Sequence, residues 1–347
     1  MNPFSLDNPV TPAPAPKTSS GIMINLRLRY ARNILKFPFP PAMKKNDAEQ
    51  LWREVSSALG EHELFRDGGR EAYLPSMRRA EKMFLAERRI LSPDMLKSRL
   101  PGGAIFSSDE KYVVLVNEED HLRISVTEPD AVSAASAASR LASLEKFLAS
   151  KFECARSTRY GFLTSCPSNL GSAFRVSALF HLGGSVLAKR ADDLLDSVEK
   201  KGYYVRGYYG EKSRYYGDVY QISTGDSPDP SSAGRVIDFL TGIEAKEQGV
   251  RDLLLSPDRS VSSSDIIWRA WGIMSSARLM SFAESLSLIS LIMLGNDIGL
   301  GIPVSRDVLQ RLMTECQPAH IQAIAGREMT AVERDEYRAD YIRGAVR

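Results

Sequence analysis

The sequence predicts an α+β fold in which an antiparallel β-sheet is flanked by helices and a C-terminal all-helical region follows. Three observations lead to this class. Two β-rich runs, at 112–116 and 121–126, are separated by a short acidic turn, as in a β-hairpin. Strand-like and helical segments are mixed without the regular spacing of a parallel βαβ sheet. Beyond residue 265 the hydrophobic pattern is wholly helical.

Size and composition limit the functions that the chain can have. Its 347 residues, 43% of them hydrophobic, suffice for one large domain or two ordinary ones. The formal charge of +2 gives no global field that would attract nucleic acid or anionic lipid. Three cysteines and four histidines are too few for a disulfide framework or a metal centre held by the protein. We expect a cytoplasmic protein that binds no nucleic acid, no membrane and no protein-ligated metal.

The elements are expected in the following order. Residues 1–21, rich in Pro, Ser and Thr, predict a flexible leader, and the sheet domain follows over 22–255. Beside the hairpin we expect helices at 47–59, 76–90 and 131–150, and strands near residue 162 and at 203–208 and 219–222.

The C-terminal part is expected to be separate. The serine-rich segment 256–264 predicts a linker to a helical domain over 265–347. In that domain, an apolar stretch at 266–294 predicts one buried core helix. Shorter helices at 305–316 and 330–342 follow, separated by Pro318.

The first candidate site is the segment Leu26-Arg27-Leu28-Arg29. In a strand, the period of two places Arg27 and Arg29 on one face and turns the leucines towards the core. Two guanidinium groups on one face fit the oxygens of a phosphate. A solvated basic face is the simpler explanation of this segment by itself.

The second candidate is the acidic hairpin turn. Glu118 and Glu119 are adjacent there, and Arg123 projects from the strand that follows. Two carboxylates at a tight turn can hold a guanidinium and accept its proton. An acidic turn that merely faces water is the alternative.

Two further segments contain suitable residues. Cys166, in a loop with Pro, Asn and Gly, is followed by Arg175, and nearby cations can stabilise a thiolate. A lone cysteine is more commonly a small buried hydrophobe. In the segment 205–211, glycines allow close approach of a ligand between Arg206 and Glu211, although an exposed hairpin fits the segment too. The sequence contains no Walker or dinucleotide fingerprint.

In this order, the four segments closely resemble the motifs of the phosphagen kinase superfamily. They are most similar to its bacterial branch, the McsB-type protein-arginine kinases. Residues 25–33 resemble the first arginine motif, 117–124 and 161–171 match two signatures unchanged, and 206–211 matches the bacterial form closely. The resemblance covers about residues 22–245. It implies the family's glutamine synthetase-like catalytic fold, with ATP and Mg²⁺ as cofactors.

The resemblance also implies roles for individual residues. The ATP phosphates would be held by five arginines: Arg27, Arg29, Arg123, Arg175 and Arg206. The catalytic set would be Glu118, Glu119, Cys166 and Glu211, with Glu119 as the base. Other nucleotide contacts are implied for Asn25, Leu26, Leu28, Arg89, Val176, Ser177, Ala178, Leu179, Gly207, Tyr208, Tyr209 and Gly210. Because the catalytic residues are all present, we expect an active enzyme.

The sequence departs from the family pattern at three places. Asn25-Leu26 replaces a Ser-Thr pair that could contact phosphate. Arg89 stands where bacterial members usually carry a histidine against adenine, and an arginine plane can stack on a base. The leader also lacks the usual bacterial N-terminal segment.

Both ends of the chain favour a protein substrate. Small-substrate members carry a helical domain before the first arginine motif, whereas only about two dozen residues precede Asn25 here. The C-terminal segment with Arg334, Asp335 and Arg338 resembles the allosteric phosphoarginine pocket of bacterial members. Two arginines four residues apart on a helix can fork a phosphoryl group. A solvated helix face with ordinary charge pairs is the alternative.

We therefore predict a protein-arginine kinase that marks proteins for Clp-type proteolysis. The resemblance implies a zinc-bearing activator protein as a partner, and the apolar C-terminal helices suggest a homodimer. A kinase for free arginine or another small guanidino compound is the first alternative. A catalytically weak adaptor that binds phosphoarginine is the second.

Overall fold

The computed structural model describes residues 21–208, 216–256 and 260–347. The strands in these ranges are β1 (Met23–Arg32), β2 (Arg70–Tyr73), β3 (Gly103–Phe106), β4 (Tyr112–Val116), β5 (Leu122–Glu128), β6 (Arg156–Ser157), β7 (Gly161–Phe162), β8 (Phe174–His181), β9 (Tyr203–Arg206) and β10 (Val219–Thr224). Eight of them form one sheet in the order β2-β3-β4-β5-β1-β8-β10-β9, and β6 pairs with β7 apart from it. Every neighbouring pair is antiparallel, which confirms the predicted class.

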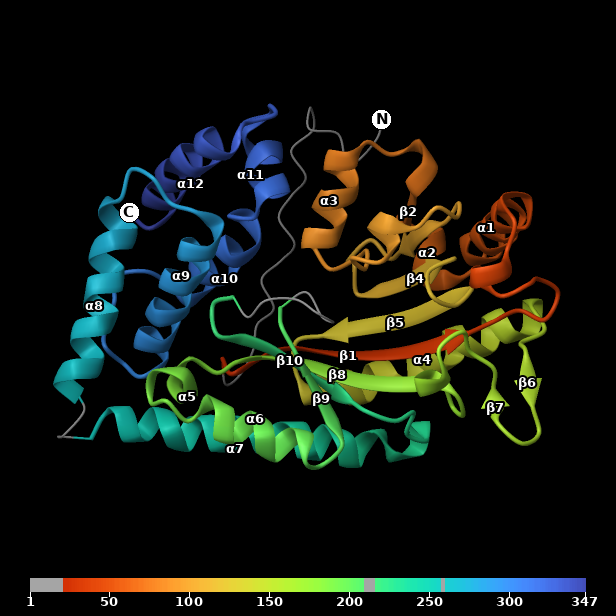
Figure 1. Ribbon diagram of the computed structural model, residues 1–347, viewed down its shortest axis with the longest axis horizontal. Helices are drawn as coiled ribbons and strands as arrows, with labels where there is room; N and C mark the ends of the chain where they lie inside the picture. The colour runs from red at the N-terminus through yellow and green to blue at the C-terminus, as the bar shows by residue number, and fades with distance from the viewer. Residues whose placement is uncertain (1–20, 209–215, 257–259) are drawn as a thin grey trace.

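Helices surround this sheet (Figure 1). Those in the described ranges are α1 (Lys45–Gly60), α2 (Glu63–Arg66), α3 (Arg79–Glu87), α4 (Ala131–Lys151), α5 (Gly183–Leu187), α6 (Ala191–Glu199), α7 (Ala233–Leu254), α8 (Ser260–Ser276), α9 (Phe282–Asp297), α10 (Arg306–Glu315), α11 (Pro318–Ala325) and α12 (Ala331–Ala345). The last five gather at one end of the sheet, as the blue end of the chain in Figure 1 shows. None of the helices in these ranges is long and apolar enough to cross a membrane.

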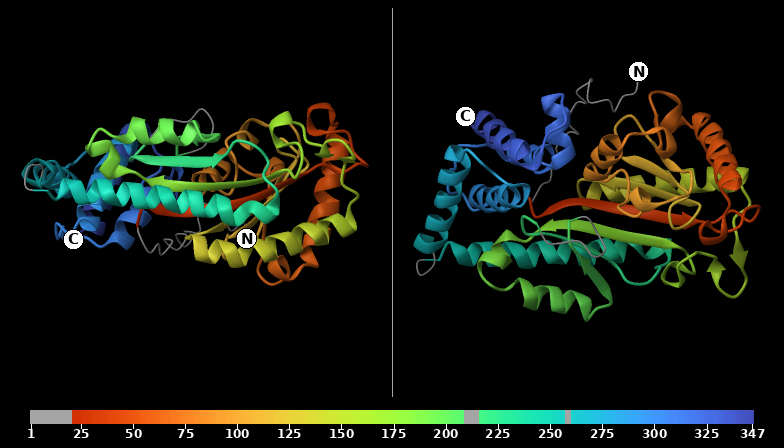
Figure 2. Two further views of the ribbon diagram at one scale, coloured as in Figure 1. Left: turned by 90° about the horizontal axis from the view of Figure 1, so that it is seen from below. Right: turned by 45° about the horizontal axis from the view of Figure 1, so that its top comes forward.

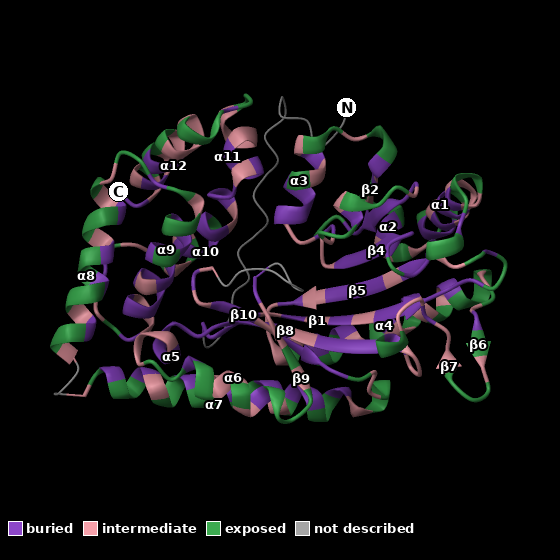
Figure 3. Cartoon of the chain, viewed as in Figure 1, coloured by how far each residue is buried: buried purple, intermediate pink, exposed green. Residues whose placement is uncertain are grey.

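One face of the sheet is covered by helices along its whole length. In β1, Leu26, Leu28 and Tyr30 point into this core, which α1, α4 and α7 close from the other side. Figure 2 shows α4 and α7 running along the sheet, and Figure 3 shows that the strands of the sheet are largely buried. Each fully buried leucine stabilises the fold by roughly 1.5–3 kcal/mol. This alternation confirms the prediction that the leucines face the core.

Among the residues that the structure describes, the opposite face of the sheet is covered only at its two ends. At one end α3 packs on β3 and β4, in a cluster that includes Phe84, Phe106 and Val113. At the other end the C-terminal helices pack on Ile24 of β1 and Leu179 of β8. The polar residues of the central strands lie between these two clusters, so the fold leaves room there for a ligand.

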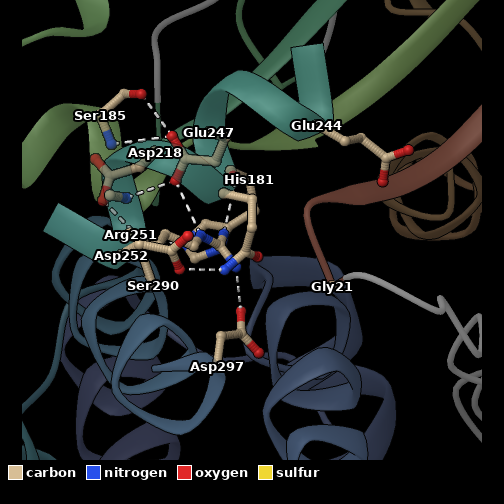
Figure 4. Close-up of polar contacts among 12 residues, drawn as sticks. Gly21, His181, Ser185, Asp218, Glu244, Glu247, Arg251, Asp252, Ser290 and Asp297 are labelled. Atoms are coloured by element: carbon tan, nitrogen blue, oxygen red, sulfur yellow. Dashed lines mark hydrogen bonds and ion pairs between the residues drawn. The ribbon is translucent and has the colours of Figure 1, made fainter. Parts of the chain in front are cut away.

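A buried polar network joins the sheet domain to the C-terminal helices (Figure 4). Arg251 of α7, 1% exposed, donates from Nε to Glu247 (3.0 Å), from Nη1 to Asp297 of α9 (2.8 Å), and from Nη2 to the carbonyl of His181 (3.1 Å). Glu247 also accepts hydrogen bonds from the amides of Gly184 and Ser185. Buried charges persist only when they are paired in this way. The network therefore fixes the end of β8 against α9.

The C-terminal region differs in two ways from the sequence prediction. The predicted linker 256–264 is helical from Ser260 onwards, because α8 begins there, and the amide of Ser260 donates to the carbonyl of Ser256 (2.9 Å). The apolar stretch 266–294 forms two helices, α8 and α9, and not one. Ser281 ends the continuity, because its hydroxyl caps α9 by accepting from the amide of Glu284 (3.2 Å).

Two further expectations change at the ends of the chain. Pro318, expected only to separate helices, is the first residue of α11, where its missing N–H costs no hydrogen bond. The predicted leader over 1–21 lies outside the described residues except for Gly21. The carbonyl of Gly21 accepts a hydrogen bond from Arg306 of α10.

Candidate active site

The arginines of β1 lie on the uncovered face of the sheet, between β5 and β8. Arg29 is paired in register with Ser125 on one side and Arg175 on the other. Arg27 donates from Nε to Thr127 Oγ1 (3.2 Å) and from Nη2 to the carbonyl of Arg89 (2.8 Å). Strand alternation and sheet order thus bring the arginines of two strands together.

The five predicted arginines surround one cavity of about 570 Å³, which we call the arginine cavity. Arg123 reaches it from β5, Arg175 from β8 and Arg206 from β9. Glu118, Glu119 and Cys166 line the same cavity. The structure therefore places in one cavity all eight predicted phosphate-binding and catalytic residues that fall within its described ranges.

The arginine cavity is electrostatically prepared for an anion. Burial, with the charges of Arg89 and Arg123, lowers the pKa of Arg27 to about 10. Burial and the charge of Arg123 lower the pKa of Arg29 well below its usual value. Guanidinium groups this crowded repel one another, and an anion among them would relieve that repulsion.

Buried polar residues hold the acidic turn in place. Asp120 Oδ1, fully buried, accepts hydrogen bonds from Asn33 Nδ2 and the amide of Ser165, both at 2.7 Å. Asn117 has a left-handed φ of 60° and donates to the carbonyls of Ala48 (3.0 Å) and Pro101 (2.7 Å). Sequence reasoning missed Asn33, Asn117 and Asp120. These buried hydrogen bonds anchor the turn to the rest of the domain, so it is more than an acidic loop that faces water.

The two glutamates of this turn have different environments. Glu118 is buried and accepts from Ser92 Oγ (2.6 Å) and from Arg123 Nη1. Burial raises the pKa of Glu118, but the charge of Arg123 and the hydrogen bond from Ser92 bring it below its usual value. Glu119 is 39% exposed and accepts from Arg123 Nη2 and from Asn169 Nδ2 (3.2 Å). Of the two glutamates, Glu119 is the one that an incoming group can reach.

Cys166 lines the arginine cavity and is not a small core residue. Its Sγ lies 3.0 Å from Ser168 Oγ, and the same hydroxyl accepts from Arg175 Nη2 (3.1 Å). Burial and the charges of Arg206 and Arg123 lower the pKa of Arg175. The thiol is therefore close to the cationic part of the cavity.

A second cavity, of about 380 Å³, adjoins the arginine cavity, and we call it the base cavity. Arg27, Arg89 and Gln221 line both. Six predicted nucleotide-binding residues border the base cavity: Asn25, Arg89, Ser177, Ala178, Leu179 and Tyr208. Leu26, Leu28 and Val176 are fully buried in the core of the opposite face, so their side chains are not available to a nucleotide.

Arg89 contacts protein groups at the boundary of the two cavities. Its backbone has a left-handed φ of 60°, which non-glycine residues seldom adopt. Its Nη2 donates to Gln221 Oε1 (2.7 Å), and its guanidinium lies 5.5 Å from the ring centre of Tyr208. Arg89 therefore connects the two cavities and packs on a tyrosine of the protein.

The structure does not place every predicted residue. Tyr209, Gly210 and Glu211 lie outside the described ranges. Gly207 is buried and borders neither cavity. Sequence reasoning also missed three residues of the base cavity that come from α10, namely Gln310, Met313 and Thr314.

The predicted phosphoarginine residues have other contacts in this structure. Arg338, 1% exposed, donates to the carbonyls of Cys316 (2.6 Å) and Met280 (2.8 Å) and to Asp335 (2.6 Å). Arg334 donates instead to the carbonyl of Met329 (2.7 Å). Arg338, paired with Asp335 on the same helix, thus holds α12 against its neighbours through the carbonyls of Cys316 and Met280.

The described residues contain no group of three His, Cys, Asp or Glu side chains placed to hold a metal ion. A divalent cation that accompanies a nucleotide can be coordinated by the oxygens of the phosphate chain and by water. Mg²⁺ is commonly bound in this way.

Comparison with known protein families finds two matches. The model of the ATP:guanido phosphotransferase C-terminal catalytic domain matches residues 50–227. The model of the protein-arginine kinase McsB C-terminal domain matches residues 261–347. The first match spans the acidic turn and the Cys166 loop, and the second spans α9 to α12.

Similar proteins extend over nearly the whole chain. A protein-arginine kinase of Pelotomaculum thermopropionicum is 35% identical over 331 residues, 93% of this chain and 92% of the relative. One of Geobacillus stearothermophilus is 31% identical over 95% of this chain and 91% of the relative.

Solved structures share the fold at lower identity. A taurocyamine kinase of Schistosoma mansoni with bound transition-state analogue components aligns with a TM-score of 0.57 at 23% identity. That alignment covers 71% of this chain and 36% of the longer, duplicated kinase. A lombricine kinase aligns with a TM-score of 0.54 at 22% identity, over 70% of this chain and 73% of that one.

Proposed function

This chain belongs to the protein-arginine kinase family of ATP:guanido phosphotransferases, and we propose that it phosphorylates arginine side chains of other proteins in the arginine cavity. The observation that supports this site is the convergence of five arginines, two glutamates and Cys166 on one cavity. The base cavity beside it provides space for the rest of the nucleotide. The comparisons confirm the family that the sequence motifs indicated.

The arginines bind and align the phosphate chain of ATP. Arg27, Arg29 and Arg175 lie next to one another across β1 and β8, so the oxygens of one triphosphate chain can contact several guanidinium groups at once. Mg²⁺ bound to the phosphates adds further charge neutralisation. Phosphoryl transfer requires mainly such alignment and electrostatic stabilisation.

The carboxylates of the turn prepare the substrate. A guanidinium has a pKa above about 12, so it attacks only if a base takes its proton. Glu119 accepts that proton as the nitrogen attacks the γ-phosphorus, the N–P bond forms, and the bond to the ADP oxygen breaks. The proton then passes from Glu119 to solvent. Glu118 stays ionised and holds the turn and Arg123.

Arg123 exchanges partners in this scheme. In this structure it donates to both Glu118 and Glu119. An arginine substrate bound at Glu119 takes over that carboxylate, and the phosphates of ATP draw Arg123 towards themselves. Cys166 and Glu211 complete the substrate site as the family resemblance implies.

The C-terminal helices serve regulation and assembly in this proposal. Residues 22–255 form the catalytic domain, and the helical domain provides the phosphoarginine pocket at Arg334, Asp335 and Arg338 once Asp335 releases Arg338. The exposed apolar residues Trp268 and Ile273 of α8 support a homodimer through that helix. We also propose, from the family role alone, a zinc-bearing activator and delivery of marked proteins to a Clp-type protease in the cytoplasm.

Incubation with ATP, Mg²⁺ and either casein or free arginine tests the proposal. Acid-labile phosphate should appear on casein and be identified as phosphoarginine by mass spectrometry. Label on free arginine alone would instead identify a small-substrate kinase. Binding of phosphoarginine without any turnover of ATP would identify an adaptor.

A further inference from the structure

The wall of the base cavity comes from two distant parts of the chain. Asn25 and Leu179 border the cavity from the sheet, whereas Gln310, Met313 and Thr314 border it from α10. α10 lies within the region matched by the C-terminal family model and outside the region matched by the catalytic one. The helical domain therefore forms part of the nucleotide site.

The position and lining of the base cavity suit a nucleobase. It shares Arg27, Arg89 and Gln221 with the arginine cavity, so a nucleotide with its phosphates among the arginines reaches it directly. Apolar side chains such as Leu179 and Met313 line it. Apolar surface beside polar groups that can fix a ligand's orientation is typical of a small-molecule site.

Gln310 is the polar side chain of α10 that lacks a partner in this wall. It is 8% exposed, and its Nε2 has no hydrogen-bond partner in the part of the chain that the structure describes. A buried amide donor without a partner is costly, and few native structures keep one without a reason. Rotation of the amide about its last bond exchanges its donor and its acceptor within the same volume.

Contacts at both ends fix α10 relative to the cavity. Arg306 in the first turn forms an ion pair with Asp297 and donates to the carbonyl of Gly21. In the last turn, the hydroxyl of Thr314 hydrogen-bonds Tyr208, another residue of the cavity wall. The amide of Gln310 is thus held on a fixed helix, as a specificity-determining group requires.

We infer that Gln310 recognises the adenine base of ATP, so that the helical domain determines which nucleotide the kinase uses. This inference rests on the proposed binding of ATP in the two cavities. A glutamine amide offers one donor and one acceptor side by side, which match N7 and the N6 amino group of adenine. Guanine has acceptors at both of these positions, N7 and O6, so the acceptor oxygen of the glutamine amide would find no donor there.

The test uses the full-length chain and measures nucleotide dissociation constants by calorimetry without any arginine substrate. The ligands are ATP and purine riboside triphosphate, which lacks the amino group, each with Mg²⁺. The variant is Gln310→Met, and Arg311→Met on the exposed side of the same helix is the matched control. We expect Gln310→Met to weaken ATP binding about tenfold and to abolish the preference for ATP over purine riboside triphosphate. Arg311→Met should leave both values as in the wild type.

Two results overturn the inference: ATP binding by Gln310→Met that equals wild type, or a loss that is the same for both nucleotides. If Gln310→Met does not fold, Gln310→Glu replaces it, because it keeps the shape, loses the donor to N7 and keeps the acceptor for the N6 amino group. This variant should weaken the binding of both nucleotides and keep the preference for ATP, so wild-type affinity for both would overturn the inference. These outcomes are independent of the proposed function. A chain that prefers ATP through Gln310 and yet phosphorylates no arginine would refute the function and keep the inference.

Discussion

Replacing Arg251 by methionine should destabilise the junction between the sheet domain and the C-terminal helices. Methionine fills a similar volume but removes the charge that Glu247, Asp297 and the carbonyl of His181 share. Arg251 is 1% exposed and Glu247 is fully buried, so water cannot replace the lost donors. The perturbation thus leaves buried carboxylates with fewer partners.

The remaining contacts set the size of this effect. Removing one partner of a buried ion pair typically costs about 3–5 kcal/mol. Glu247 keeps three donors, the amides of Gly184 and Ser185 and the hydroxyl of Ser185, and Asp297 keeps Arg306. We therefore expect a loss near the lower end of that range, about 3 kcal/mol.

Urea unfolding followed by circular dichroism measures this loss. A destabilisation of this size should move the midpoint by about 1 M, given a slope of roughly 3 kcal/mol per molar urea. Arg269→Met is the control, because the Arg269–Asp265 pair on α8 is exposed and should contribute less than about 1 kcal/mol. A shift for Arg251→Met no larger than that of the control would refute the reasoning about the junction.

Three more predictions concern catalysis, acid stability and the thiols. Glu119→Gln should lower kcat about 10²- to 10⁴-fold, because it removes the general base. ATP binding measured by calorimetry should stay unchanged. A wild-type kcat in this variant would show that Glu119 is not the base. Burial and Arg251 hold the pKa of His181 well below its usual value, so the unfolded chain binds more protons and stability should fall as pH drops below about 6.5. His181→Gln should flatten that dependence in unfolding titrations, and an unchanged slope would contradict it. Iodoacetamide should modify Cys166, which lines the arginine cavity, and inactivate the kinase unless ATP is present. Cys316 should not react, because burial raises the pKa of its thiol. Mass spectrometry identifies the modified thiol, and inactivation with Cys166 unmodified would refute this prediction.

Local periodicity predicted the parts of the site that lie within single strands. The alternation of Leu26-Arg27-Leu28-Arg29 was sufficient to place both arginines on one face, and the register of β1 with β8 confirms it. The two β-rich runs likewise form the β4–β5 hairpin. Such patterns are visible because strand geometry repeats every two residues.

Contacts between distant segments could not be predicted in this way. No sequence pattern in the C-terminal region indicated that α10 would border the base cavity. The contact between Arg306 of α10 and Gly21 joins residues that are 285 positions apart in the chain. The burial of Asp120 beneath the acidic turn was equally hidden, because its partners Asn33 and Ser165 come from other loops. Tertiary packing determines these features, and no local pattern encodes them.

The central claim is that one cleft binds the ATP phosphates and the arginine substrate together. A crystal structure of the protein with ADP, Mg²⁺, an arginine-containing peptide and nitrate, a planar mimic of the transferred phosphoryl group, tests it most directly. The account predicts nitrate among Arg29, Arg123 and Arg175, with the peptide guanidinium against Glu119. Phosphates bound away from these arginines, or a peptide guanidinium far from Glu119, would contradict it.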